Sequence, residues 1–241
     1  MIYFRTSPLI RCDSLLTLLA MSIEENLKNI KTTIAKTAGE WKRPAIDINL
    51  VAVSKKQPAE KIQAALDAGH RLYGENRVQE AQDHWAAHKV NYPDLKLHLI
   101  GPLQTNKIKD ALSIFDVIET VDREKLARKL GAAMAEQGVS IPCFIQVNTG
   151  EEEQKAGIAP HALRDFLKFC TDECGLNIQG LMCIPPVDDP PALHFALLQK
   201  LAKEHNLPEL SMGMSSDFEK AIPLGATYVR VGTGIFGERG Y

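Results

Sequence analysis

The stretch LVAVSKKQPAE, residues 50–60, decides the fold and raises the first question about function. It opens with four apolar residues, the pattern of a strand that is buried on both faces of a sheet. Polar residues follow at Ser54, Lys55 and Lys56, and Pro58 then introduces a helical pattern that Gly69 closes. A buried strand that leads directly into a helix is the repeating unit of parallel α/β sheets.

The same alternation of strand and helix runs along the rest of the chain. Eight apolar runs alternate with helical patterns, at residues 48–54, 71–76, 95–101, 115–121, 141–148, 176–185, 209–215 and 227–233. Asp122 is expected to N-cap the helix after the fourth run, and Pro190 and Pro191 to open the helix after the sixth. Eight strands over 241 residues predict a single (β/α)8 TIM barrel. An open doubly wound sheet is disfavoured, because its first strand usually leads into a glycine-rich turn and VSKKQP contains no glycine.

Composition narrows the class of protein. The net charge of −2 gives no global basic footprint for nucleic acid, and no apolar run approaches the length of a membrane span. The five cysteines form no C-x-x-C pair, which predicts reduced thiols in a cytoplasmic protein. Residues 1–20 are expected to be a disordered or mis-assigned N-terminal extension. Residues 21–241 are expected to form the barrel domain, which starts with an extra amphipathic helix at Met21.

The histidines predict no metal site. His98 lies in the middle of an apolar run and is expected to be a packed core residue. The other six lack the zinc-protease pattern and are expected at the surface: His70, His84, His88, His161, His194 and His205.

Functional residues of a (β/α)8 barrel gather at the carboxyl ends of its strands. The residues at these positions are Ser54, Lys55, Glu75, Asn76, Arg77, Gly101, Gln104, Asn148, Thr149, Met182, Pro185, Ser215, Ser216, Arg230, Gly232 and Thr233.

The ends of the seventh and eighth runs predict a phosphate cradle. Ser215 stands where a helix begins, and backbone N–H groups at a helix start favour an anion. Gly232 and Thr233 lie in the neighbouring loop, where glycine lets the backbone approach a ligand closely. Barrels often bind phosphate between their last two loops. The alternative is that Ser215 only caps its helix and the glycines only form a tight turn.

Lys55 predicts a covalent site. Since successive strand residues point to opposite faces, Lys55 points into the barrel with Val51 and Val53, while Lys56 points away. An amine in a barrel mouth loses hydration, its pKa falls, and in its neutral form it can form a Schiff base with an aldehyde. A lysine opposite a phosphate cradle indicates a phosphate-bearing aldehyde cofactor, and pyridoxal 5'-phosphate is that cofactor. The alternative is a lysine that only extends its charge into water.

Arg230 lies two residues before Gly232 on the same face of the eighth run. A guanidinium cannot accept a proton, so it would donate a hydrogen bond to an unprotonated ring nitrogen and weaken the cofactor as an electron sink. The alternative is an ion pair in the barrel core or at the surface.

Seven motifs carry a resemblance to a known family: AVSK (52–55), GENRVQE (74–80), HLIGPLQTNK (98–107), IQVNTG (145–150), GLMCIP (180–185), MGMSSDFEKAI (212–222) and VRVGTGIFGERGY (229–241). In this order they resemble the pyridoxal phosphate homeostasis proteins (the YggS/PROSC family), from about Met21 to Tyr241. The resemblance implies a barrel similar to the barrel domain of alanine racemase.

The resemblance also implies the site and the role. Pyridoxal 5'-phosphate would form a Schiff base with Lys55, its phosphate would contact Ser215, Gly232 and Thr233, its ring nitrogen would contact Arg230, and Asn76 would line the site. The family's role is to buffer the cofactor in vitamin B6 and amino-acid homeostasis. Pyridoxal-phosphate-dependent apoenzymes are the partners expected to receive the cofactor.

The end of the chain favours a carrier over an enzyme. The sequence ends at Tyr241, just after the eighth run, so we expect no C-terminal β domain of the kind that supplies the second base in racemases. A monomer without nucleic-acid or membrane partners is expected. Two alternatives remain. One is a weak pyridoxal-phosphate-dependent racemase or lyase that uses Tyr73, Lys155 or Tyr241 as a second acid/base. The other is a sugar-phosphate barrel in which Lys55 acts as in an aldolase.

Overall fold

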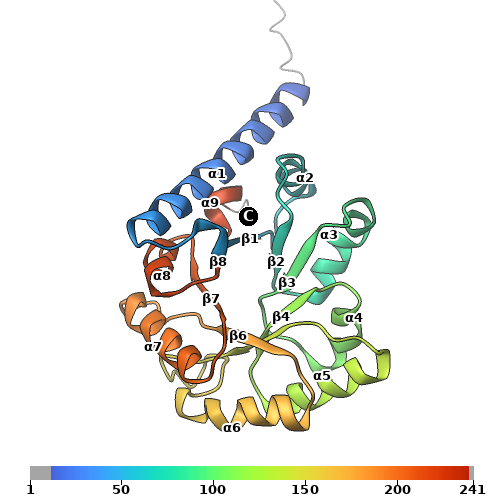
Figure 1. Cartoon of the computed structure of the whole chain (residues 1–241). Coiled ribbons are helices and arrows are strands. Elements are labelled where there is room, and N and C mark those ends of the chain that lie inside the picture. The colour runs from blue at the N-terminus through green and yellow to red at the C-terminus, as the bar shows by residue number, and fades with distance from the viewer. Residues whose placement is uncertain (1–11, 239–241) are drawn as a thin grey trace, which may run out of the picture.

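The computed structural model describes residues 12–238, and residues 12–17 by their backbone alone. Eight parallel strands close into a barrel in chain order (Figure 1). They are β1 (Asn49–Val53), β2 (Leu72–Glu75), β3 (Lys96–Leu99), β4 (Val117–Val121), β5 (Cys143–Gln146), β6 (Ile178–Met182), β7 (Glu209–Met214) and β8 (Tyr228–Val231). Each strand lies inside the apolar run that predicted it, so the (β/α)8 barrel is confirmed.

Barrel closure brings the first and the last strands together. β1 pairs with β2 on one side and with β8 on the other, and Val51 lies opposite Arg230. On the far side of β8, Arg230 lies opposite Met214 of β7. The loops that follow β1, β7 and β8 therefore share one end of the barrel.

Helices surround the barrel (Figure 1). They are α1 (Cys12–Glu40), α2 (Ala59–Asp67), α3 (Val78–Asn91), α4 (Ile108–Leu112), α5 (Glu124–Gln137), α6 (Leu163–Lys168), α7 (Pro191–Glu204), α8 (Phe218–Ala221) and α9 (Thr233–Phe236). As predicted, α7 opens at Pro191, with Pro190 as its N-cap. The prediction that Asp122 caps α5 is wrong by one residue. Arg123 holds the N-cap position in extended conformation, and the Asp122 carboxylate accepts a hydrogen bond from its guanidinium.

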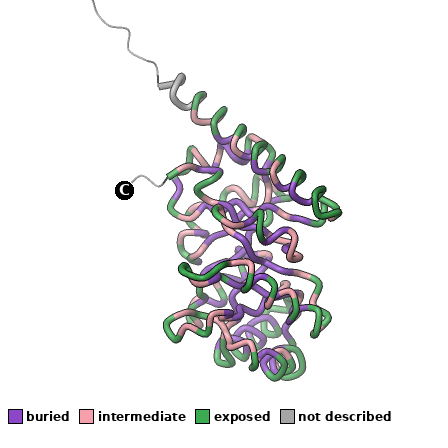
Figure 2. Tube along the Cα trace, turned by 90° about the vertical axis from the view of Figure 1, so that its left-hand side faces the viewer, coloured by how far each residue is buried: buried purple, intermediate pink, exposed green. Residues whose placement is uncertain are grey.

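The first helix begins earlier than predicted. A start at Met21 was expected, but α1 already begins at Cys12, so residues 12–20 continue the same helix. The sequence between them holds no glycine or proline that would break it. Residues 1–11 of the predicted extension lie outside the described residues. Figure 2 shows the first coloured turns of α1 projecting beyond the barrel, and Leu18 and Met21, which lie in this part of the helix, are exposed.

The rest of α1 is held by its apolar face. Ile23, Leu27, Ile30 and Ile34 recur at helical spacing and are buried. They belong to the main hydrophobic core, and α1 packs on α2 and α9. Within the described part of the chain, no helix is both long enough and apolar enough to cross a bilayer.

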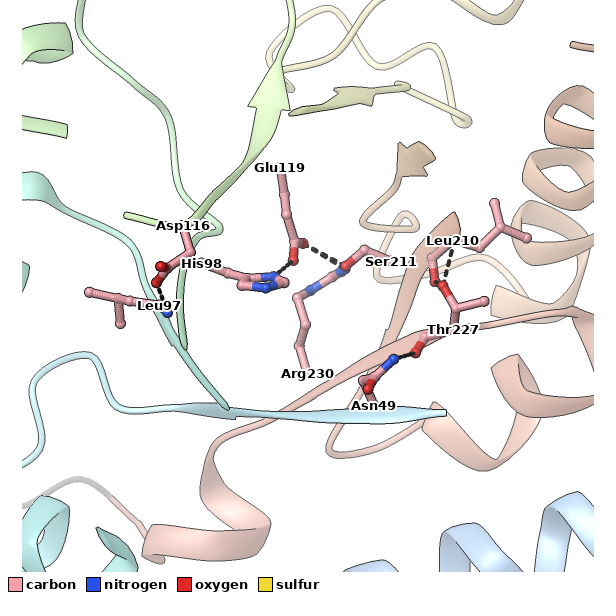
Figure 3. A network of polar contacts seen from close by, with 9 residues as sticks. All are labelled: Asn49, Leu97, His98, Asp116, Glu119, Leu210, Ser211, Thr227 and Arg230. Carbon is pink, nitrogen blue, oxygen red and sulfur yellow. Dashed lines mark hydrogen bonds and ion pairs between the residues drawn. The ribbon is translucent and has the colours of Figure 1, made fainter. Parts of the chain in front are cut away.

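The barrel wall separates two kinds of core. Outward residues such as Leu50 and Ala52 join the large apolar core under the helices. Inside the barrel, a small separate cluster consists of Val117, Phe144 and Met182, with Tyr228 packed against it. Buried polar side chains lie there as well, among them His98, Glu119, Ser211 and Arg230 (Figure 3).

Candidate active site

A cavity of about 330 Å³ opens at the carboxyl ends of the strands. It is lined by Val53, Lys55, Asn76, Ile100, Ile184, Met214, Ser215, Ser216, Arg230, Gly232 and Thr233. All six residues predicted to form the site are among them. The apolar walls come from Val53, Ile100, Ile184 and Met214, which sequence reasoning did not single out.

The loops after β7 and β8 meet at Ser215. The backbone N–H of Gly232 donates a hydrogen bond to the Ser215 hydroxyl at 3.1 Å. The alternative in which Ser215 caps the next helix is wrong. Asp217 is the N-cap of α8, and its carboxylate accepts the N–H of Met214 at 2.6 Å. Three residues that carry hydroxyls, Ser215, Ser216 and Thr233, line the cavity together with Gly232.

Gly213 makes this arrangement possible. Its φ of +89° lies in the left-handed region, and a Cβ there would lie 2.7 Å from the Cβ of Ala221. Only glycine combines this conformation with such close packing, because any other side chain would push α8 away from β7.

Lys55 points into the cavity because the residue before it, Ser54, points to the outer side of the barrel wall. The Ser54 hydroxyl donates to Glu75 Oε1 at 2.6 Å on the outer side of the barrel wall, and Ser54 is fully buried. The alternation of strand residues then directs Lys55 to the inner side, where it lines the cavity. Lys56 lies outside it, in a hollow shared with Lys61 and His84.

Arg230 lies inside the barrel below the same cavity. One of its terminal nitrogens, Nη2, donates to the Cys183 carbonyl at 2.8 Å. The other, Nη1, donates to the Ser211 hydroxyl at 2.5 Å and lies 3.9 Å from Glu119 Oε2 (Figure 3). The ion pair considered as the alternative for Arg230 is therefore present, and Arg230 also lines the cavity. The two interpretations do not exclude each other.

Sequence reasoning missed Glu119. No residue of the fourth apolar run was among the predicted site residues, yet Glu119 receives bonds from His98 Nδ1 at 2.7 Å and from the Ser211 hydroxyl at 2.5 Å. Burial by itself would raise the pKa of Glu119, but the hydrogen bond from His98 and the charges of His98 and Arg230 lower it below its usual value. The missed signal was alternation, which places Val117 and Glu119 on the same inward face of β4.

The charges of the cavity suit an anion. Among the described residues that line it are two cations, Lys55 and Arg230, and no carboxylate. The nearby Glu119 is engaged by the buried network instead of facing the cavity. No cluster of three or more His, Cys, Asp or Glu side chains within residues 12–238 is placed to hold a metal ion.

The comparisons with known proteins agree on one family. The family model for the N-terminal domain of alanine racemase matches residues 22–240. The pyridoxal phosphate homeostasis protein of Vibrio cholerae is 40% identical over 230 residues, which cover 91% of this chain and 98% of the relative. The protein of the same name from Escherichia coli K12 is 35% identical, with 91% and 97% covered.

This chain belongs to the pyridoxal phosphate homeostasis proteins.

Solved structures support that assignment. PipY of Synechococcus elongatus, solved with pyridoxal phosphate bound, is 37% identical and aligns with a TM-score of 0.76 over 89% of this chain and all of its own. A protein of Bifidobacterium adolescentis aligns with a TM-score of 0.86 at 30% identity, covering 95% of this chain and 98% of its own. The alanine racemase of Clostridium difficile shares 15% identity at a TM-score of 0.70, which shows a common fold.

In this member of the pyridoxal phosphate homeostasis family, two of the candidate second acid/base groups lie away from the cavity. Tyr73 is buried on the outer side of the barrel wall, where its ring packs against Trp85 and its hydroxyl donates to the His70 carbonyl at 3.2 Å. Burial raises the pKa of Tyr73 far above its usual value. Lys155 pairs with Glu152 at 2.6 Å and does not line the cavity. Tyr241 lies outside the described residues.

The histidine predictions were partly correct. His98 is a buried core residue, as expected. His70 and His194 are also buried, so their prediction as surface residues was wrong. His70 donates through Nε2 to the Leu72 carbonyl at 2.7 Å, and burial lowers its pKa to about 4.

Proposed function

We propose that this chain binds pyridoxal 5'-phosphate in the cavity at Lys55 and buffers and delivers it in vitamin B6 and amino-acid homeostasis. One observation carries the proposal: a single cavity collects an amine, a guanidinium and three hydroxyls, with no carboxylate among the described residues that line it. The names of the curated relatives and the pyridoxal phosphate bound to PipY support it.

The residues present fit this cofactor. The cavity of about 330 Å³ is within the usual range for small-molecule sites. The hydroxyls of Ser215 and Thr233 are donors of the kind that a phosphate group needs, and Gly232 lies beside them with its own N–H bonded to the Ser215 hydroxyl. The walls of Val53 and Ile184 suit a flat aromatic ring. When bound, the cofactor supplies an aldehyde that condenses reversibly with an amine. Lys55 is the amine that we propose for this link.

The same residues favour retention of the cofactor over turnover. Arg230 is held in an ion pair with Glu119 and donates hydrogen bonds without accepting a proton, so it would leave the ring nitrogen unprotonated. Tyr73 is walled off from the cavity. Within the described lining, Lys55 is the one group suited to move a proton. We propose a cytoplasmic carrier that acts as a monomer and passes its cofactor to apoenzymes.

The variant Lys55→Ala tests the proposal, with replacement of the neighbouring lysine as its control. Incubation with pyridoxal phosphate should give the wild type an absorption band near ~420 nm, as expected for a lysine-bound pyridoxal cofactor. Lys55→Ala should lose this band, and the control Lys56→Ala should keep it, because Lys56 lies outside the cavity. Borohydride reduction followed by mass spectrometry should find the added mass on Lys55.

Two outcomes would contradict the proposal. A wild type that stays colourless would favour the sugar-phosphate barrel, and an unchanged band in Lys55→Ala would remove the role of Lys55. Turnover of an amino-acid panel that is abolished in Lys55→Ala would favour the weak racemase or lyase.

A further inference from the structure

We infer that Glu119 is a positioning residue of the cavity, one that holds the guanidinium of Arg230 in place from inside the barrel. The inference rests on the proposed function only for its effect on cofactor binding. The network that carries it is defined by contacts within the chain alone.

The network joins opposite sides of the barrel. His98 comes from β3, Glu119 from β4, Ser211 from β7 and Arg230 from β8. Figure 3 shows the four side chains converging in the barrel interior, with Glu119 between His98 and Ser211. All four are buried, and Glu119 is fully so. A contact between β4 and β8 across the interior constrains Arg230 from a part of the chain that does not line the cavity.

Both oxygens of Glu119 are engaged in this task. Oε1 accepts from His98 Nδ1, and Oε2 accepts from the Ser211 hydroxyl and faces Arg230 Nη1 at 3.9 Å. Ser211 has a single proton to donate. Since Glu119 takes that proton, the hydroxyl presents a lone pair to Arg230, from which it accepts a hydrogen bond at 2.5 Å. The carboxylate therefore orients the hydroxyl, and the hydroxyl orients the guanidinium.

The charge of Glu119 matters as much as its hydrogen bonds. A guanidinium that is taken out of water requires a counter-charge, and Arg230 is only 4% exposed. Within the described part of the chain, Glu119 holds the one carboxylate within 4.0 Å of Arg230. With Nη1 and Nη2 both anchored in the barrel, the planar guanidinium cannot rotate, and the part that lines the cavity keeps one orientation. A ligand then meets a donor that is already ordered.

A double-mutant cycle tests this role. Pyridoxal phosphate is titrated by absorbance into the wild type, Glu119→Gln, Arg230→Gln and the double variant. We expect Glu119→Gln to raise Kd about tenfold, the size of one lost charge-assisted hydrogen bond. In the Arg230→Gln background the same change should alter Kd by less than about twofold, because Glu119 then has no guanidinium to position. Equal fold-losses in both backgrounds, or an unchanged Kd in Glu119→Gln, would overturn the inference.

A matched control separates positioning from general damage to the core. Glu75 is also fully buried and also accepts from a serine hydroxyl, but it lies on the outer side of the wall. The coupling is the ratio of the Kd change that Glu119→Gln causes with Arg230 present to the change that it causes in Arg230→Gln. Adding Glu75→Gln to every variant should alter this ratio by less than about twofold. If Glu119→Gln does not fold, Ser211→Ala replaces it in the cycle, since it keeps both charges and removes only the bridging hydroxyl.

A second readout needs no cofactor. In protein without added pyridoxal phosphate, the Arg230 guanidinium protons should exchange slowly with water by NMR, and at least about tenfold faster in Glu119→Gln. Equal exchange rates would overturn the inference even if the cofactor binds. A wild type that binds no pyridoxal phosphate but shows this difference would refute the proposed function and leave the positioning role of Glu119 standing.

Discussion

Glu75 and Glu119 are both fully buried, and each accepts a hydrogen bond from a serine hydroxyl, yet they lie on opposite sides of the barrel wall. Glu119 faces the interior, where His98 donates to its Oε1, the Ser211 hydroxyl donates to its Oε2, and the buried cation of Arg230 lies 3.9 Å from Oε2. Glu75 faces the helices. Its Oε1 accepts from Ser54 and from the Trp85 indole at 3.1 Å, while Oε2 has no hydrogen-bond partner among the described residues.

The difference shows that burial alone does not define what a carboxylate does. The outer glutamate ties the ends of β1 and β2 to α3 through the neutral donors of Ser54 and Trp85. Its Oε1 also lies 3.6 Å from His84 Nδ1, and this contact raises the pKa of His84. The inner glutamate compensates a charge. Removal of the Glu119 charge leaves the Arg230 cation without a counter-charge in the barrel, whereas removal of the Glu75 charge leaves the neutral donors of Ser54 and Trp85 without their charged acceptor.

The largest expected effect is on stability when each carboxylate is neutralised. Glu119→Gln should lower the free energy of unfolding at pH 7 by about 3–5 kcal/mol, the range for breaking a buried ion pair. Glu75→Gln should lower it by only about 1–2 kcal/mol. Urea unfolding measures both. Since the pKa of Glu119 is lowered on folding, its contribution is complete above the unfolded pKa and is lost as the pH falls through the folded one. The difference in the free energy of unfolding between wild type and Glu119→Gln should therefore disappear at acid pH. Equal losses of stability in Glu119→Gln and Glu75→Gln at pH 7 would contradict the difference between the two carboxylates.

The surroundings of two buried histidines, His98 and His70, can be compared in the same way. His98 faces a carboxylate, whereas His70 faces the Leu72 carbonyl. Burial lowers the pKa of His70 to about 4, although the hydrogen bond to Leu72 acts in the opposite direction. The unfolded chain takes up this proton near pH ~6.5, so stability should fall between there and pH 4, by up to about 3 kcal/mol. His70→Gln, which keeps a donor, should remove this pH dependence of urea unfolding. A wild-type stability that is flat between pH 6.5 and 4 would contradict the assignment.

The smallest expected effect is the loss of stability when either of the two serines, Ser211 or Ser54, is replaced by alanine. Ser211 donates to Glu119 and accepts from Arg230, while Ser54 donates to Glu75, which keeps the Trp85 donor. Ser211→Ala should cost about 2–3 kcal/mol because two charged partners each lose a bond, and Ser54→Ala about 1 kcal/mol. Thermal unfolding of Ser211→Ala and Ser54→Ala measures which of the two loses more stability. A larger loss in Ser54→Ala would reverse the proposed difference between the two sides of the wall.

Particular residues show how far sequence reasoning could reach. The alternation that directs Val51 and Val53 inward predicted that Lys55 enters the barrel, and Lys55 lines the cavity. The glycines after the eighth run predicted a close approach of backbone to a ligand, but not the hydrogen bond from Gly232 to Ser215. Glu119 escaped notice because its partner Ser211 lies 92 residues away in the chain. The start of α1 was misplaced because SLLTLLAM continues a helix as readily as it precedes one.

The sequence by itself determined the eight strands, their order around the barrel and which residues point inward, because apolar runs alternate with helical patterns along the chain and successive residues of a strand point to opposite faces. Only the tertiary structure decided which inward residues meet. The register between neighbouring strands sets that, and irregularities between β4 and β5 and between β7 and β8 shift it in ways that no local pattern encodes. The ion pair of Glu119 with Arg230 exists because the closed barrel brings β4 and β8 face to face across its interior.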